Sequence, residues 1–350
     1  MKPIWIAGLS AVAFALPVVA QPVIGAKSGI VNYVEGRVYL ADKPLEMQPA
    51  QFPEVKENLT LRTEEGRAEV LLTPGTVLRA GENTSFKMLT NRLVDTRLEL
   101  LTGSITVVAM EVSKDVNVTV VFKDSTVTFP KAGVYRLDAE PGSLKVFKGT
   151  ADVKSGTSVT TVGGGKMLSL SSALAAAEKF NPELTDGLDR WTRRRDELMA
   201  ISNVSAANQA RKRSAGSNPC ADASLRNHPG VIMNLGSWGY NPYYGFGTYI
   251  PCRGSVASPY GYRYWSPLGA YHAFFAPRPV YQPPSDAGMG RPSYSTMAPS
   301  SGGYSGVSSV ASSAPAAAPA AAASSGSSSA AAAPSSSVGG GATGGGGRGH

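Results

Sequence analysis

The segments Ser104-Ile-Thr-Val-Val-Ala109 and Val116-Asn-Val-Thr-Val-Val-Phe122 decide the fold, because both are short and rich in β-branched residues. Residues 29–34 and 67–72 have the same character, and several of these segments alternate apolar with polar side chains. Such alternation is typical of a strand with one buried face and one hydrated face. We therefore predict a strand-rich, mainly β protein.

Turn-forming residues separate these segments. Gly or Pro recurs about every 8 to 12 residues between Gly36 and Gly165, a spacing that is typical of all-β folds. Residues 27–170 are thus predicted to form one β domain, folded as a β-solenoid or a β-sandwich. The two alternatives stay open, because both consist of short alternating strands.

The charge distribution argues against nucleic acid as a partner. Residues 27–170 hold 18 basic and 17 acidic residues, and the formal net charge of +8 is spread thinly along the 350-residue chain. A nucleic-acid binder concentrates Lys and Arg on one face or segment. We therefore expect no nucleic-acid partner.

The chain is also poor in the residues that carry catalysis. It has three His and two Cys, which leaves few metal ligands or nucleophiles. A pair of carboxylates, as in glycosidases, would still be possible. The candidates lie close to Arg62 and Arg67 and are read as ordinary surface ion pairs: Glu64, Glu65, Glu69 and Glu99. We expect a protein that is not an enzyme, with no catalytic residues, no metal and no cofactor.

The N-terminus predicts export. Lys2 precedes an apolar run over residues 4–19, which is shorter than the roughly 20 residues of a membrane-spanning helix. Small residues before Gln21 complete the pattern of a secretory signal peptide over residues 1–20, with an uncleaved anchor as the alternative. We expect a periplasmic, secreted or cell-surface protein, with no stable membrane insertion after cleavage.

The two cysteines agree with that compartment. Cys220 and Cys252 are the only pair, and an oxidising environment favours a disulfide between them. Such a bridge would stabilise a segment that is short of aliphatic residues by about 3–4 kcal/mol. Two free thiols are the alternative.

Five motifs of residues 27–170 carry a resemblance. They are Gly29-Ile-Val-Asn-Tyr-Val-Glu-Gly-Arg-Val38, the segment 61–79, Leu100-Leu-Thr-Gly-Ser-Ile105, Gly133-Val-Tyr-Arg-Leu137 and the segment 144–153. In this order they resemble the FecR-type domain, a β-rich periplasmic domain. The resemblance implies a module that relays a signal to a cytoplasmic sigma factor, although no later stretch of this chain reaches membrane-spanning length.

Residues 171–215 are predicted to be helical. Asn181-Pro182-Glu183 has the composition of a helix start, with Asn as the cap and Pro at the first position. Apolar residues then fall on one helical stripe: Leu184, Leu188, Trp191 and Leu198. The run of Arg over residues 193–195 is read as a solvated helix face.

Aromatic residues dominate the segment 216–297. Eleven of the 14 Tyr lie between Tyr240 and Tyr304, interleaved with Gly and Pro. Such residues suit stacking on carbohydrate rings, and packing on the β domain is the alternative. The candidate binding residues are Trp238, Tyr240, Tyr243, Tyr244, Tyr262, Tyr264 and Trp265. Residues 298–350, almost entirely Ala, Ser, Gly and Pro, are predicted to be a disordered tail.

These patterns predict a non-enzymatic, FecR-like protein that binds or scaffolds at the cell envelope. The expected partner is a cell-wall or surface polysaccharide, or an envelope protein. An envelope signalling module that works through a membrane partner is the first alternative. A glycan-active enzyme is the second.

Overall fold

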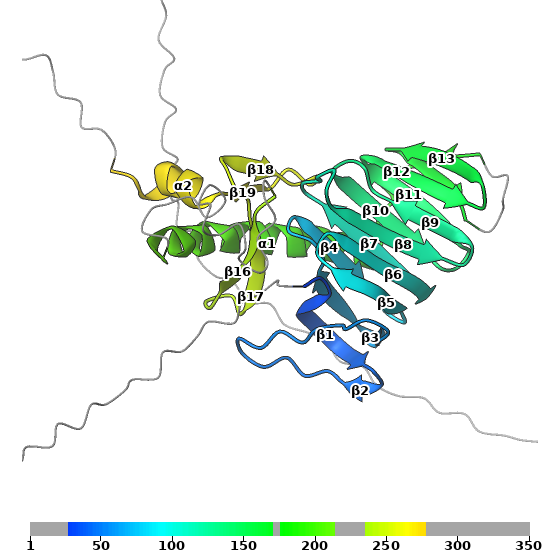
Figure 1. Cartoon of the computed structure of the whole chain (residues 1–350), viewed down its shortest axis with the longest axis horizontal. Coiled ribbons are helices and arrows are strands. Elements are labelled where there is room, and N and C mark those ends of the chain that lie inside the picture. Colours follow the sequence, from blue (N-terminus) through cyan, green and yellow to red (C-terminus); the bar gives the residue numbers. More distant parts are fainter. Residues whose placement is uncertain (1–26, 171–175, 214–234, 278–350) are drawn as a thin grey trace, which may run out of the picture. The chain divides into compact units, whose positions relative to one another are not determined.

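A computed structural model describes residues 27–170, 176–213 and 235–277. The fold is mainly β, as predicted, and most strands belong to one large sheet (Figure 1). Its strands are β1 (Ile30–Leu40), β2 (Lys43–Pro44), β3 (Thr60–Leu71), β4 (Thr76–Ala80), β5 (Ser85–Arg92), β6 (Asp95–Thr102), β7 (Ser104–Ala109), β8 (Asn117–Phe122), β9 (Ser125–Thr128), β10 (Gly133–Asp138), β11 (Ser143–Lys148), β12 (Thr150–Ser155), β13 (Ser158–Gly163), β14 (Lys166–Ser169) and β15 (Glu178–Lys179).

The sheet is one continuous ladder with the order β13-β12-β9-β8-β6-β5-β3-β4-β7-β10-β11-β14-β15, and β1 pairs along β3. Strand β3 joins two halves of this ladder. Its first residues pair with β5 and its last residues pair with β4. Between them Gly66 faces Gly36 so closely that a Cβ at Gly66 would lie 2.6 Å from the Arg37 nitrogen. The sheet therefore bends at β3.

The two halves face each other across one hydrophobic core. Buried side chains from both halves form a single cluster, among them Leu78, Ile105 and Leu144 from the β4 half and Phe86, Leu98 and Val120 from the β5 half. Every pairing except β6 with β8 is antiparallel. This is the sandwich alternative, because a solenoid would stack parallel strands.

Helix α1 (Gly187–Arg213) follows the sheet, inside the predicted helical segment. It does not begin at Asn181-Pro182-Glu183, so that part of the prediction is wrong. The Asn181 side chain accepts a hydrogen bond from the Glu183 nitrogen at 3.0 Å and forms a turn instead. Asp186 caps the helix by accepting from the Asp189 nitrogen at 3.0 Å, and the Asp189 carboxylate accepts from the Asp186 nitrogen at 3.2 Å. This reciprocal pair is a capping box.

Two hairpins and a short helical segment pack on α1. They are β16 (Ser237–Asn241) with β17 (Phe246–Ile250), β18 (Ser255–Ala257) with β19 (Arg263–Trp265), and α2 (Pro267–Ala270) with the π-helical turn η2 (Tyr271–Phe275). Asn203 of α1 donates to the Tyr249 carbonyl and accepts from the Trp265 nitrogen, both at 2.7 Å. One side chain of the helix thus fixes both hairpins.

Several predictions fall outside the described residues: the signal peptide 1–20, the tail 298–350 and Cys220. Cys252 is buried, and the described ranges hold no free cysteine. The disulfide with Cys220 stays a prediction. No helix in the described part of the chain has the length and apolarity needed to cross a membrane.

The Gly149 corner between β11 and β12 supplies a stability test. Gly149 has φ +90°, and a Cβ there would lie 2.2 Å from the Tyr135 hydroxyl and 2.7 Å from the Ala132 carbonyl. We expect Gly149→Ala to lower the free energy of unfolding by about 2–4 kcal/mol in urea titrations. Gly156→Ala is the matched control, because Gly156 has φ +58° with open space around it. Its cost should stay near 1 kcal/mol; equal losses would contradict the steric explanation.

Candidate functional site

A row of directly paired residues crosses the outer face of the β4 half. Directly paired residues of neighbouring strands project from the same face of a sheet. The row runs over six strands, from β1 to β11, as Tyr33, Glu69, Arg79, Thr106, Arg136 and Lys145. Most of these side chains are charged or polar, so this face needs a polar covering element rather than an apolar one.

Helix α1 covers the first part of the row. Glu69 and Arg79 are fully buried there, and the Arg79 Nε lies 2.8 Å from the Glu69 carboxylate. From the helix, Arg195 Nη2 approaches the same carboxylate at 2.7 Å. The Asn32 amide of β1 donates a further hydrogen bond to it at 2.8 Å. Glu69 thus accepts from three donors on two strands and one helix.

The charges of this cluster decide its protonation. Burial alone would raise the pKa of Glu69, but the guanidiniums of Arg195 and Arg79 outweigh burial and lower this pKa to about 2. The Arg195 guanidinium also lies over the rings of Tyr33 at 4.0 Å and Phe246 at 4.5 Å. It is therefore held as a cation between a carboxylate and two aromatic faces.

Asp196 extends the cluster toward the second hairpin. Its buried carboxylate accepts a hydrogen bond from the Tyr264 hydroxyl at 2.9 Å. Burial raises the pKa of Asp196, and the nearby Arg79 charge acts against that increase. With Glu69 and Arg195, the cluster holds two acids and two guanidiniums, so the charges balance when all four are ionised.

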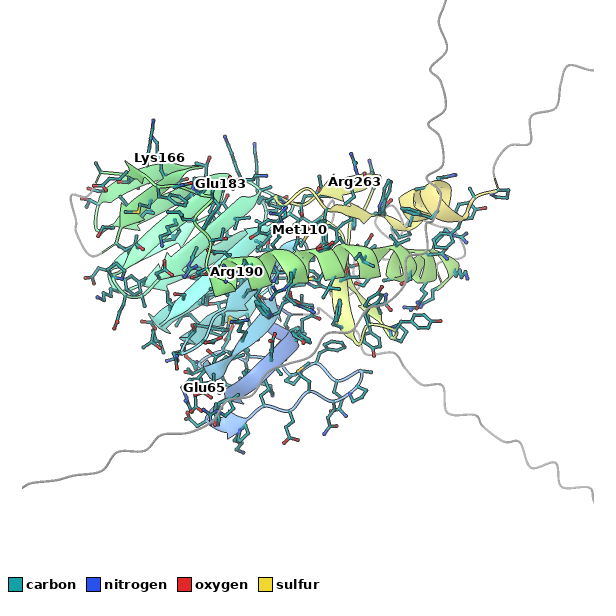
Figure 2. The ribbon with its side chains drawn as sticks, turned by 180° about the vertical axis from the view of Figure 1, so that it is seen from behind. Glu65, Met110, Lys166, Glu183, Arg190 and Arg263 are labelled. Carbon is teal, nitrogen blue, oxygen red and sulfur yellow. The ribbon has the colours of Figure 1, made fainter. Side chains whose placement is uncertain are left out.

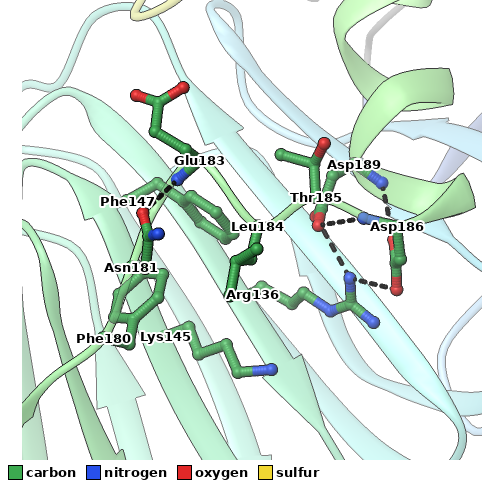
Figure 3. Close-up of a pocket in the computed structure, with 10 residues that line it drawn as sticks. All are labelled: Arg136, Lys145, Phe147, Phe180, Asn181, Glu183, Leu184, Thr185, Asp186 and Asp189. Carbon is green, nitrogen blue, oxygen red and sulfur yellow. Dashed lines mark hydrogen bonds and ion pairs between the residues drawn. The ribbon is translucent and has the colours of Figure 1, made fainter.

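The row continues beyond the N-terminal end of α1 into a hollow of about 490 Å³ (Figure 3). Arg136 and Lys145 form its floor, and the chain that leads into the helix forms its wall. A second hollow of about 390 Å³ adjoins it and shares Phe147 and Glu183. We call these two hollows together the linker groove. Figure 2 shows Glu183 beside the sheet, at the same end of α1 as Arg190.

Ion pairs hold the wall of the linker groove in place. Arg136 reaches Asp138 at 2.7 Å, Asp186 at 2.6 Å and Asp189 at 3.1 Å. Two of these three acids are the capping residues of α1. Lys145, one-third exposed, lies 3.2 Å from Asp138. The floor of the groove and the start of the helix are therefore one connected ionic network.

The linker groove also has an apolar part. The rings of Phe147 and Phe180 meet edge to face at 5.1 Å, and both are half-buried. Leu184 is 78% exposed beside them. A ligand in the groove would meet aromatic and aliphatic carbon flanked by charges of both signs.

The aromatic residues predicted as a binding surface have different environments. Trp238 and Tyr264 are buried in the cluster around Met199, where they pack against Tyr249. Three more are half-buried, namely Tyr240, Tyr262 and Trp265. The exposed pair, Tyr243 and Tyr244, lies in the turn between β16 and β17. The structure does not bring all seven onto one surface.

Two sequence interpretations need correction here. Glu69 is not part of a surface ion pair but is fully buried, and Arg195 is buried rather than on a solvated helix face. By contrast, Glu64 and Glu65 do form surface pairs, with Arg37. The buried Arg79 was missed, although its place between apolar residues of β4 was a signal.

The ranges that the structure covers contain no group of three or more His, Cys, Asp or Glu residues arranged to hold a metal ion.

Removal of the central carboxylate should be costly. Glu69→Gln leaves two buried guanidiniums, those of Arg79 and Arg195, with Asp196 as the one remaining acid of the cluster, and we expect the free energy of unfolding to fall by about 3–5 kcal/mol. Glu65→Gln is the matched control, because Glu65 is exposed and pairs with Arg37 at 3.1 Å. The control should leave urea unfolding unchanged. Similar behaviour of the two variants would show that the buried cluster does not stabilise the fold.

The low pKa of Glu69 predicts a specific acid sensitivity. A carboxyl whose pKa is lower in the folded state stabilises the fold above its unfolded pKa and loses that contribution as pH falls. On folding, the pKa of Glu69 falls from an ordinary value of 4.5 to about 2. This lower pKa stabilises the folded state by about 3 kcal/mol, and the contribution is lost as the pH falls across that interval. Unfolding measured from pH 5 to about pH 2 should therefore show a shallower loss for Glu69→Gln than for the wild type. Parallel curves would contradict the assignment.

Comparisons with known proteins find similarity to the chain only among solved structures. No protein-family model matches it, and no curated protein matches it. Two crystal structures from Parabacteroides distasonis, each described as a "putative anti-sigma factor", are similar to part of it. The first shares 13% identity at a TM-score of 0.31, over 39% of this chain and 64% of that one. The second shares 14% identity at a TM-score of 0.30, over 40% and 63%. The chain thus spans less than two thirds of either structure, and both scores are too low to carry the fold or the function across.

Proposed function

We propose that this protein is a non-catalytic binding module of the bacterial cell envelope, and that its linker groove holds a segment of another protein. The observation that carries the proposal is the groove itself. Two adjoining hollows of about 490 and 390 Å³ lie along the chain that leads into α1. Their combined size suits a few side chains of an extended peptide.

The groove is preformed, which supports a binding role. Its wall is fixed to its floor by the ion pairs of Arg136 with Asp186 and Asp189. Arg195 then fixes the same helix to the sheet through Glu69. A site whose walls are already ordered loses little conformational entropy when a ligand binds.

The chemistry of the groove favours a peptide over a neutral sugar. Lys145 and Arg190 offer donors to carboxylates, while Glu183 offers an acceptor to amines and amides. Phe147 and Phe180 meet edge to face and do not offer one open flat platform. Sugar rings stack on open aromatic faces, whereas peptide side chains use apolar contacts together with charges of both signs.

A protein partner makes envelope signalling the preferred form of this function. Scaffolding on a polysaccharide remains the alternative, and its contact surface would be Tyr243 and Tyr244, the exposed pair of the β16–β17 turn. Location in the periplasm or at the cell surface rests on the signal-peptide pattern of residues 1–20.

Photo-crosslinking in cells tests the groove. A photoreactive phenylalanine at position 184, in place of the exposed Leu184, should form an adduct with one protein. The same residue at position 94 is the matched control, because Val94 is also exposed, at 52%, but lies in the β5–β6 turn. An inner-membrane protein in the adduct would support signalling. Scaffolding on a polysaccharide would instead give an adduct from a photoreactive phenylalanine at position 243, and equal protein adducts at positions 184 and 94 would contradict the groove.

A substitution in the floor should weaken that adduct. Lys145→Gln removes a cation of the groove and should reduce the yield at position 184 by about tenfold, the effect of one charge-assisted hydrogen bond. Lys123→Gln, in the exposed β8–β9 turn, is the control and should leave the yield unchanged. Equal yields from both variants would place the contact outside the groove.

A further inference from the structure

The described chain after Glu197 is positively charged without any acidic residue. Residues 198–213 and 235–277 contain five basic residues and no Asp or Glu. The five are Arg211, Lys212 and Arg213 at the end of α1, and Arg253 and Arg263 around β18 and β19. Of these, Lys212, Arg213, Arg253 and Arg263 are exposed.

Large apolar side chains are exposed in the same part of the chain. Leu268 of α2 is 49% exposed, and Phe274 and Phe275 of η2 are 55% and 44% exposed. The Phe274 ring meets the half-buried Trp265 edge to face at 5.4 Å. Two consecutive exposed Phe beside a half-buried Trp form an apolar patch, and exposing such a patch to water is unfavourable. Patches of this kind mark sites of interaction with proteins or membranes.

The basic and apolar residues lie together. Ala206 and Ala207 of α1 share a buried cluster with Ala270 of α2, so the two helices are in contact. The Gly254 carbonyl accepts from the Ser266 nitrogen at 2.9 Å, which places Arg253 beside the start of α2.

Figure 2 shows Arg263 over the middle of α1, between the sheet and α2, where the adjacent Tyr264 hydroxyl donates to Asp196 of the helix. We call this surface the basic end; its members are Lys212, Arg213, Arg253, Arg263, Leu268, Phe274 and Phe275.

We propose that the basic end binds the surface of an anionic phospholipid bilayer. Leu268, Phe274 and Phe275 would enter the region between headgroups and acyl chains, where aromatic side chains are favoured. The four exposed cations would lie near lipid phosphates, each contributing attraction that falls off within a Debye length. Among the described residues 198–213 and 235–277 no carboxylate opposes this attraction, and Glu197, which accepts from the Tyr262 hydroxyl at 3.3 Å, borders the surface.

Vesicle co-sedimentation of the chain from Gln21 onward tests this surface. The probes are vesicles of phosphatidylcholine alone and vesicles that mix it with phosphatidylglycerol. We expect binding to the mixed vesicles, little binding to phosphatidylcholine, and a decrease with added salt. Equal binding to both vesicle types, or none to either, would overturn the proposal.

Two variants separate the apolar part from the charged part. Phe274→Ser with Phe275→Ser should reduce partitioning by at least tenfold, the effect of about one buried apolar side chain. Arg253→Gln with Arg263→Gln should reduce it about 30-fold on the mixed vesicles only, at roughly 1 kcal/mol per cation.

Val94→Ser with Arg97→Gln is the matched control on the sheet, and it should bind as the wild type does. All these side chains are exposed, so unchanged urea unfolding midpoints would confirm that each variant is folded.

A soluble anionic polymer distinguishes lipid from charge alone. If the Phe274→Ser, Phe275→Ser variant binds both dextran sulfate and the mixed vesicles as tightly as the wild type does, the surface recognises charge only and the lipid assignment is wrong. The linker groove lies at the other end of α1, so vesicle binding and crosslinking at Leu184 can fail separately.

Discussion

The buried carboxylate of Glu69 is the constraint on which the arrangement of this protein depends. A carboxylate that leaves water must find charged donors, or it destabilises the fold by several kcal/mol. Arg79 supplies one guanidinium from the neighbouring strand, and Arg195 supplies the second from α1. A helix with only apolar side chains on this face would bury the Glu69 carboxylate without the Arg195 guanidinium, and the folded state would be less stable. The sheet therefore specifies both that a helix lies on it and which turn of the helix lies over Glu69.

The same row of side chains also explains why there is a groove. Arg136 and Lys145 continue the row past the point where α1 begins at Gly187, so no helix covers them. Asp186 and Asp189 have two roles, because they cap the helix and also form ion pairs with Arg136. One ionic network thus ends the covered part of the face and begins the open part.

The strands could be predicted from the sequence, because alternation and turn residues are local signals. Alternation does not say whether the outer face meets water or another element. Glu69 was read as exposed for that reason, since the residue that covers it, Arg195, lies 126 positions later in the chain.

The helix start was misplaced because Asn181 and Pro182 have the composition of a cap but form a turn, while Asp186 forms the actual helix cap. The aromatic segment left two interpretations open, a stacking surface or packing against the rest of the protein, because Gly and Pro interrupt it. Those residues form tight hairpins that direct Trp238 and Tyr264 inward against α1.

The length of α1 sets the distance between the two proposed surfaces, the linker groove and the basic end. The helix has 27 residues, which at 1.5 Å per residue is about 40 Å. The linker groove adjoins its first turn, and the basic end includes its last turn. A protein held on a bilayer by the basic end would therefore keep the groove as much as about 40 Å from the lipid contact, with Asn203 fixing the hairpins to the helix between them. That separation is within reach of the exposed segment of a membrane protein, which is the kind of partner proposed for the groove.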